Sequence, residues 1–212
     1  MSITHHLDDA TLMSFAAGAL PAALSAVAAS HAAMCARCRR EVATLERVGG
    51  ALLAALAPAM LDRAEPSAPA APVLPARQEH HEAGQSVELP KPLARLLYGD
   101  LDAVRWRRLG LGVWHHRLPV EGSGGLWLLK VAPGGVLPQH GHSGAELTLV
   151  LRGSFHDATG RYRIGDVADL DETIEHQPVA DPGPDCICLV ASEAPARFRG
   201  LIARLMQPMH GL

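Results

Sequence analysis

The stretch from Gly134 to Gly153 carries two histidines and a glutamate in the pattern Gly-x5-His-x-His-x3-Glu-x6-Gly. His140 and His142 are two residues apart, so on a β-strand their side chains point to the same face. Glu146 opens the next apolar run, Glu-Leu-Thr-Leu-Val-Leu, and is expected to begin a strand beside them and to point the same way. Imidazoles and a carboxylate on one inner face suit a transition metal. The stretch therefore predicts a metal site inside a β-structure.

This pattern resembles the first sequence motif of the cupin family at every fixed position, which implies a jelly-roll barrel. The family's second motif supplies a further histidine on a later strand, and His176, which follows Gly165-Asp166, takes that place. The usual Pro-x-Gly turn of that motif is missing, and acidic residues fill the loop instead. The expected ligands are His140, His142, Glu146 and His176. Zinc is the expected metal, the spacing also suits iron, manganese or nickel, and a barrel that keeps these residues without a metal is the alternative.

Short apolar runs alternate with Gly and Pro turns from about residue 104 onward, and the last run is Ile202–Met206. Many short strands at such spacing indicate a barrel or sandwich, so we expect an all-β domain over residues 104–212. Alternation places Cys186 and Cys188 on one face of a strand. Cysteines in such positions are most often small buried apolar residues, while a redox pair and additional metal ligands are the alternatives.

A second group of metal-binding residues lies near the N-terminus, in His31-Ala-Ala-Met-Cys-Ala-Arg-Cys. Spacings of four and three residues bring His31, Cys35 and Cys38 to one side of a helical segment. One imidazole and two thiolates suit structural zinc, which takes four tetrahedral N or S ligands. His5 and His6 are the other histidines in this part, and either could supply the fourth ligand. A redox dithiol is the alternative, but the βαβ pattern that accompanies it is absent.

The N-terminal residues 1–61 are rich in Ala and Leu and predict three helices. Asp8-Asp9 marks the start of the first helix, and Pro21 suits the first turn of the second. The third is expected over about residues 36–56, where apolar residues recur at helical spacing. About 60 residues form a marginal core, so a bound metal has a stabilising purpose there.

Residues 62–91 are rich in Pro, Ala, Ser and Glu, a composition that favours an extended linker. A short helix near residues 92–98 is expected to follow and to pack on the helical part. The predicted fold class is therefore α + β with two domains, a small zinc-stapled all-α bundle followed by an all-β cupin barrel.

Charge and hydropathy argue against several classes of protein. The formal net charge is −3, so a polyanion-binding surface is not expected and nucleic acid is not favoured as a direct partner. The N-terminus shows no basic region followed by an apolar run, so no signal peptide is expected, and the longest apolar stretch, Val48–Leu61, is shorter than the roughly 20 residues that span a membrane. We therefore expect a cytoplasmic protein without membrane contact, whose four cysteines stay reduced.

His6 followed by His31-x3-Cys35-x2-Cys38 in an Ala-rich helical segment resembles the signature of the zinc-binding anti-sigma domain. With the barrel motif added, the chain is similar to the ChrR-type anti-sigma factors over nearly its whole length. The resemblance implies that His6 is the fourth zinc ligand and that the protein is not an enzyme. It implies that the chain inhibits an extracytoplasmic-function (ECF) sigma factor and releases it on an oxidative signal such as singlet oxygen, which regulates transcription. The alternative is a metal-dependent cupin oxygenase with an accessory zinc domain.

Overall fold

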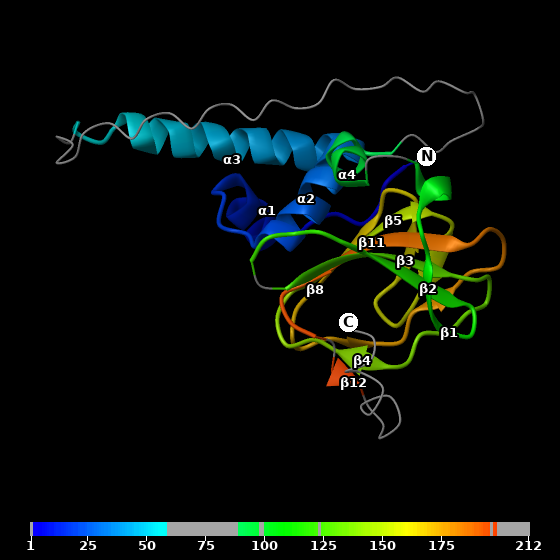
Figure 1. Ribbon diagram of the computed structural model, residues 1–212. Helices are drawn as coiled ribbons and strands as arrows, with labels where there is room; N and C mark the ends of the chain where they lie inside the picture. Colours follow the sequence, from blue (N-terminus) through cyan, green and yellow to red (C-terminus); the bar gives the residue numbers. More distant parts are fainter. Residues whose placement is uncertain (1, 59–88, 98–99, 123, 196, 199–212) are drawn as a thin grey trace.

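The structure, a computed structural model, describes residues 2–58, 89–97, 100–122, 124–195 and 197–198. A group of helices precedes a β-rich part, and the helices lie on one side of it (Figure 1). The α + β fold class expected from the sequence is confirmed. Most of the linker predicted over residues 62–91 lies outside the described residues, as does the strand predicted at Ile202–Met206.

The helices of the described part are α1 (Asp9–Ala16), α2 (Ala22–Met34), α3 (Ala36–Ala54) and α4 (Lys91–Leu97). The Asp8 carboxylate caps α1 by accepting a hydrogen bond from the backbone N–H of Thr11 at 2.6 Å, so the helix begins where the sequence predicts. Pro21 stands at the N-cap of α2 rather than inside its first turn. The short helix expected near residues 92–98 is α4, which contacts α2 and buries Leu93 completely. Among the described residues, no helix has the length and apolar character needed to cross a membrane.

Short strands make up the rest of the described chain, with one 3-10 turn (Leu101–Ala103) before them. They are β1 (Arg107–Gly110), β2 (Val113–Leu118), β3 (Gly125–Val131), β4 (His140–Gly141), β5 (Glu146–Arg152), β6 (Ser154–His156), β7 (Arg161–Arg163), β8 (Val167–Leu170), β9 (Glu175–His176), β10 (Val179–Ala180), β11 (Cys186–Ser192) and β12 (Arg197–Phe198). The large sheet has the order β1-β2-β3-β11-β5-β8, and two three-stranded sheets, β10-β6-β7 and β12-β4-β9, complete the barrel.

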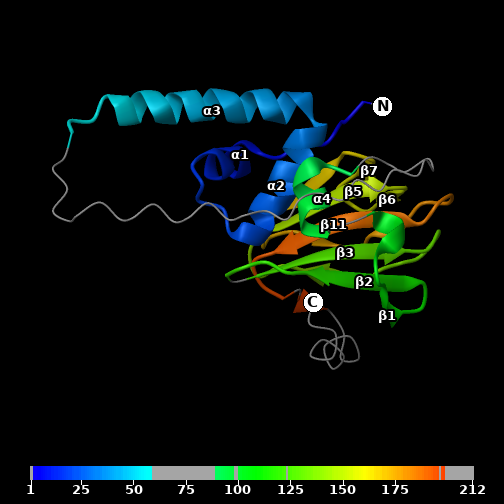
Figure 2. The same cartoon turned by 45° about the horizontal axis from the view of Figure 1, so that its top comes forward.

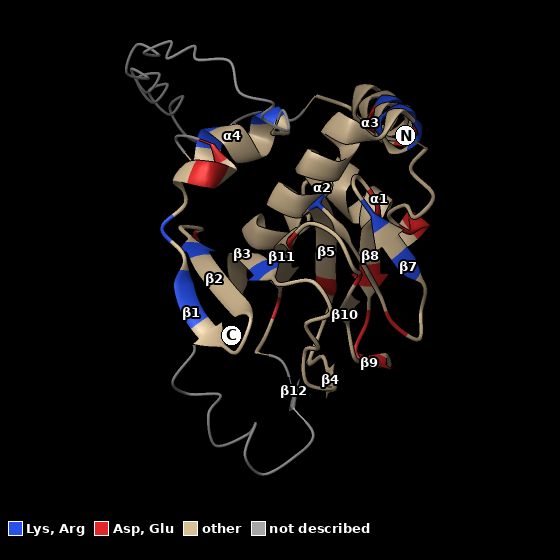
Figure 3. Ribbon diagram, turned by 90° about the vertical axis from the view of Figure 1, so that its right-hand side faces the viewer, with Lys and Arg blue, Asp and Glu red and all other residues tan. Residues whose placement is uncertain are grey.

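The large sheet separates two apolar cores because side chains alternate between its faces. The outer face packs on the helices through fully or almost fully buried residues such as Leu126, Leu128, Leu147, Leu149 and Leu189. Helix α2 lies across this face (Figures 2 and 3). Its residues Leu24, Val27 and Ala28 are buried in the same core. The inner face fills the barrel with residues such as Val131, Val150, Cys186 and Cys188. The helices and the outer face of the sheet thus share one continuous core.

Residues 3–8, called the N-terminal strap from here on, bind the helical part to the turn between β7 and β8. The buried carboxylate of Asp166 accepts hydrogen bonds from the backbone N–H groups of Thr4 at 2.7 Å and His5 at 3.0 Å. The backbone N–H of Val167 donates to the carbonyl of His5 at 3.4 Å. The strap therefore pairs with the start of β8 through its backbone, without forming a regular strand.

Gly165 lies directly under the strap and has a conformation that favours glycine. Its φ is +90°, and a Cβ at this position would lie 2.8 Å from side-chain atoms of Ile3. We expect Gly165→Ala to lower the free energy of unfolding by about 1–3 kcal/mol, because backbone strain and overpacking add. Denaturant unfolding measures this, with Gly183→Ala as the control, since Gly183 has a φ of +130° and no atom within 4 Å of the added Cβ. Equal losses for the two variants would show that the close approach of Ile3 adds nothing to the cost of the Gly165→Ala change.

Candidate metal centres

The first group of metal-binding side chains lies where the strap meets the helices, and we call it the thiolate cluster. His6 lies in the strap, and His31 lies in the last turn of α2. Cys35 is the single residue between α2 and α3, and Cys38 lies in the first turn of α3. One ligand atom of each lies within 4.8 Å of the others. His6 Nδ1 lies 3.3 Å from the sulfur of Cys35, and His31 Nε2 lies 3.3 Å from that of Cys38. The structure brings together His6, His31 and both cysteines, while His5 lies outside this group.

The break between α2 and α3 is what positions the two sulfurs. Cys35 has an extended backbone, and its Sγ caps α3 by accepting a hydrogen bond from the backbone N–H of Cys38 at 3.5 Å. The barrel orients the neighbouring imidazole, because His31 Nδ1 donates to the carbonyl oxygen of Gly165 at 2.9 Å. That bond leaves the lone pair of Nε2 facing the sulfurs, as in a ligating histidine.

The ionisation of the thiolate cluster fits a divalent cation. Burial lowers the pKa of His31 to about 4, so its imidazole is neutral and able to coordinate. Burial also raises the pKa of the Cys38 thiol to about 11, and the nearby sulfur of Cys35 adds to the rise. A cation offsets the repulsion between two buried thiolates and so stabilises the deprotonated form. Two sulfurs and two imidazole nitrogens are a donor set typical of structural zinc.

The second group lies inside the barrel, and we call it the imidazole cluster. His140 and His176 face each other on the neighbouring strands β4 and β9, with their Nε2 atoms 3.1 Å apart. His142 Nδ1 lies 3.3 Å from one carboxylate oxygen of Glu146, and His176 Nε2 lies 3.9 Å from the other. All four residues are buried, and their ligand atoms lie within 4.8 Å of one another. The unusual loop before His176 therefore does not keep that residue away from the other three.

Two groups outside the imidazole cluster orient its histidines. The carbonyl oxygen of Pro138 accepts a hydrogen bond from His140 Nδ1 at 2.9 Å, and the buried carboxylate of Asp157 accepts one from His176 Nδ1 at 2.7 Å. Each bond leaves an Nε2 lone pair directed to the centre of the cluster. Burial raises the pKa of Asp157, but hydrogen bonds from His176 and Thr159 outweigh burial and hold that pKa at about 2. Sequence reasoning missed Asp157, because the Asp-Ala-Thr-Gly segment signals a turn and nothing more.

The imidazole cluster also fits a divalent cation. Burial lowers the pKa of His140, which favours the neutral, coordinating form. Burial raises the pKa of Glu146, but the surrounding histidines, His142 foremost, lower it below its ordinary value overall. A buried carboxylate among neutral imidazoles is unfavourable unless a cation balances its charge. Three imidazoles and one carboxylate suit zinc, iron, manganese or nickel.

Cys186 and Cys188 belong to neither cluster. As the alternation predicts, both point to one face of β11, which is the inner face, and both are buried with their sulfurs 3.7 Å apart. Contact with Cys186 and burial raise the pKa of the Cys188 thiol well above its ordinary value. A thiol that stays protonated is a weak nucleophile and a weak ligand.

Comparison with proteins of known function identifies the family of this chain. It is 41% identical to the anti-sigma-E factor ChrR of Cereibacter sphaeroides, over 98% of this chain and 98% of that protein. The chain belongs to the ChrR family of anti-sigma factors. The profile of the ChrR cupin-like domain matches residues 95–196. This ChrR-family chain also matches a chain in the crystal structure of Rhodobacter sphaeroides SigE in complex with the anti-sigma ChrR, with a TM-score of 0.74 at 41% identity, over 90% of this chain and 100% of that one.

Proposed function

We propose that this chain binds and inhibits an ECF-type sigma factor and releases it on an oxidative signal such as singlet oxygen. The observation that carries this proposal is the match to the chain crystallised with SigE, which extends over 90% of the present chain, helices and barrel together. A bound sigma factor is kept from RNA polymerase, and its release switches on transcription. The chain therefore acts as a regulator and not as an enzyme.

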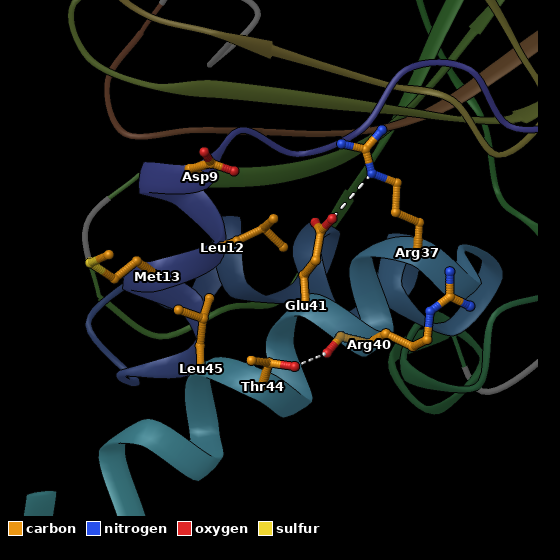
Figure 4. A pocket seen from close by; sticks show the side chains of 8 residues that line it. All are labelled: Asp9, Leu12, Met13, Arg37, Arg40, Glu41, Thr44 and Leu45. Carbon is orange, nitrogen blue, oxygen red and sulfur yellow. Dashed lines mark hydrogen bonds and ion pairs between the residues drawn. The ribbon is translucent and has the colours of Figure 1, made fainter.

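The surface of α1 and α3 supports this proposal. Helix α3 projects beyond the other described elements (Figure 1). It exposes an apolar strip, with Val48 54% and Leu52 67% exposed. A groove of about 620 Å³ between α1 and α3 continues this strip (Figure 4). The groove is lined by Asp9, Leu12, Met13, Arg37, Arg40, Glu41, Thr44 and Leu45. Leu45, Val48 and Leu52 follow one another at helical spacing, so the apolar strip on α3 leads into a groove that also carries charged side chains, a surface suited to a protein partner.

We further infer zinc in the thiolate cluster, held by His6, His31, Cys35 and Cys38. Zinc bound there would tie the strap, α2 and α3 together at one point. The imidazole cluster is inferred to hold zinc, or iron, manganese or nickel, through His140, His142, Glu146 and His176. Thiolate ligands require reduced cysteines, which suits the cytoplasm. Residues 1–61 would then inhibit the sigma factor, residues 104–212 would read the signal, and residues 62–91 would join the two.

Co-purification tests this function directly. Co-expression of the full chain with an ECF sigma factor should give a stoichiometric complex, and elemental analysis should find metal in both clusters. Failure to bind any ECF sigma factor from the same genome would contradict the proposal. Oxygen consumption by the purified chain with a small substrate would favour a cupin oxygenase instead.

The exposed strip on α3 gives a prediction that does not involve the metal. Val48→Asp combined with Leu52→Asp should weaken sigma-factor binding about 10–100-fold, because charges then replace apolar side chains in the proposed interface. Isothermal titration calorimetry measures the affinity, and elemental analysis should show unchanged metal content. Leu111→Asp is the matched control, since Leu111 is 91% exposed in the turn between β1 and β2. Unchanged affinity in the α3 double variant would place the partner on another surface.

A further inference from the structure

The carboxylate of Asp157 joins the imidazole cluster to the turn between β6 and β7. Its Oδ2 accepts the hydrogen bond from His176 Nδ1 at 2.7 Å, and the side chain is fully buried. Its Oδ1 accepts from the hydroxyl of Thr159 at 2.6 Å and from the backbone N–H groups of Thr159 and Gly160 at 2.7 and 3.2 Å. One buried carboxylate thus fixes both the orientation of His176 and the conformation of the turn.

The other end of the same turn contacts the N-terminal strap. The Thr159 hydroxyl donates to Asp157, so Tyr162 must be the donor in the 2.8 Å contact between the two hydroxyl oxygens. The ring of Tyr162 stacks on Phe155 and packs against the imidazole of His5, with the His5 and Tyr162 centroids 4.4 Å apart. The His5 imidazole also lies against Gly160, where an added Cβ would be 3.0 Å from Nε2. His5 therefore sits on a surface whose shape depends on the turn.

The strap places His5 and His6 on opposite sides, as expected for neighbouring residues of an extended segment. His5 faces the barrel, and the next residue, His6, contributes its Nδ1 to the thiolate cluster. Hydrogen bonds with Asp166, Val167 and Asp169 hold the strap here, together with the His5 ring packing and the buried side chain of Leu7. A segment without regular secondary structure can exist in a docked and a released state, and a signal acts by changing the balance between the two.

We propose that the path through Asp157, Thr159, Tyr162 and His5 transmits a change at the imidazole cluster to the thiolate cluster. When His176 leaves its position, Asp157 loses its buried partner and the turn relaxes. His5 then loses the surface it packs on, the strap shifts toward its released state, and His6 moves away from the sulfurs. The inference rests on the proposed function in taking the barrel as the part that reads the signal.

A cycle of variants in the metal-loaded full chain tests this path without a sigma factor. In a Cys186→Ser, Cys188→Ser background, only Cys35 and Cys38 remain to react with N-ethylmaleimide, and mass spectrometry follows their modification. His140→Ala disturbs the imidazole cluster and should raise the modification rate about fivefold. In the presence of Thr159→Val, the same His140→Ala change should raise the rate less than about twofold, because the path is already broken.

Two further variants make the outcome decisive. Tyr162→Phe removes only the hydroxyl and keeps the ring packed between Phe155 and His5, so it should reproduce the loss of coupling without loss of folding. Thr173→Val is the matched control, because Thr173 donates to Asp171 through its backbone N–H and hydroxyl just as Thr159 does to Asp157, and it lies closer in sequence to His176. In that background His140→Ala should keep its full effect.

The proposed path is wrong if His140→Ala leaves the modification rate of Cys35 and Cys38 unchanged. It is also wrong if His140→Ala raises that rate equally in the Thr159→Val, Tyr162→Phe and Thr173→Val backgrounds. Because no sigma factor takes part, this result stands apart from the proposed function. Absence of sigma binding would overturn that function alone. If His140→Ala raises the modification rate by the same factor in every background while sigma binding is normal, the path alone is overturned.

Discussion

Replacing either cysteine of the thiolate cluster, Cys35→Ser or Cys38→Ser, is expected to abolish metal binding there and to weaken sigma-factor binding at least about 100-fold. The cluster joins the strap, the end of α2 and the start of α3, so it sets the direction in which α3 leaves the molecule. Serine cannot supply a thiolate, and a structural zinc site with three ligands loses most of its affinity. Without the metal, the buried thiol and imidazoles no longer fix the surface formed by α1 and α3.

Elemental analysis and calorimetry on the same preparations check both parts of this expectation. The thiolate cluster should lose its metal while the imidazole cluster keeps its own. Cys188→Ser is the matched control, since Cys188 is also buried but lies inside the barrel, on the inner face of β11, and in neither cluster. A Cys35→Ser variant that bound its sigma factor normally would show that the metal does not organise the inhibitory surface.

The local parts of both clusters could be predicted from residue spacing, the distant members His6 and His176 only from the family resemblance, and the groups that orient the histidines not at all. His31, Cys35 and Cys38 lie within two helical turns, so their spacing alone brings them to one side. The choice between His5 and His6 could not be made from spacing, because neighbouring residues of an extended strap face opposite ways and nothing local shows which side meets the barrel. The carbonyl of Gly165 that orients His31 lies 134 residues away in sequence, and only the folded chain brings the two together.

The strand pattern of the barrel was also predictable, since β5 and β11 begin at Glu146 and Cys186, where the sequence predicts strands. The common core of helices and sheet was not. Leu24 and Val27 lie in the second of the three helices predicted for a separate small bundle, yet they pack on the outer face of the sheet. An apolar face shows that a helix has a partner but does not show which element that partner is.

Glu146→Gln in the barrel is expected to slow the signal-dependent release of the sigma factor and to change sigma-factor affinity much less. The change removes the only carboxylate of the imidazole cluster and should abolish metal binding there. Glu146 points to the inner face of β5, while its neighbours Leu147 and Leu149 point outward to the helices. The surface that carries α2 is therefore unchanged, and sigma-factor affinity should change less than about tenfold. Release of the sigma factor by photosensitised singlet oxygen should slow by at least about tenfold, because the metal site proposed to read the signal is gone.

Glu121→Gln makes the same chemical change at an exposed position in the turn between β2 and β3, so it should leave metal content, affinity and release as they are. Size-exclusion chromatography of the complex before and after illumination with methylene blue measures release, and elemental analysis confirms the loss of metal. Normal release from the Glu146→Gln complex would move the sensor out of the barrel, with the thiolate cluster as the remaining oxidisable metal-binding group among the described residues. Loss of sigma binding in the same variant would mean that the imidazole cluster maintains the inhibitory conformation even without a signal. Only retained binding together with slowed release separates inhibition by the helices from sensing by the barrel.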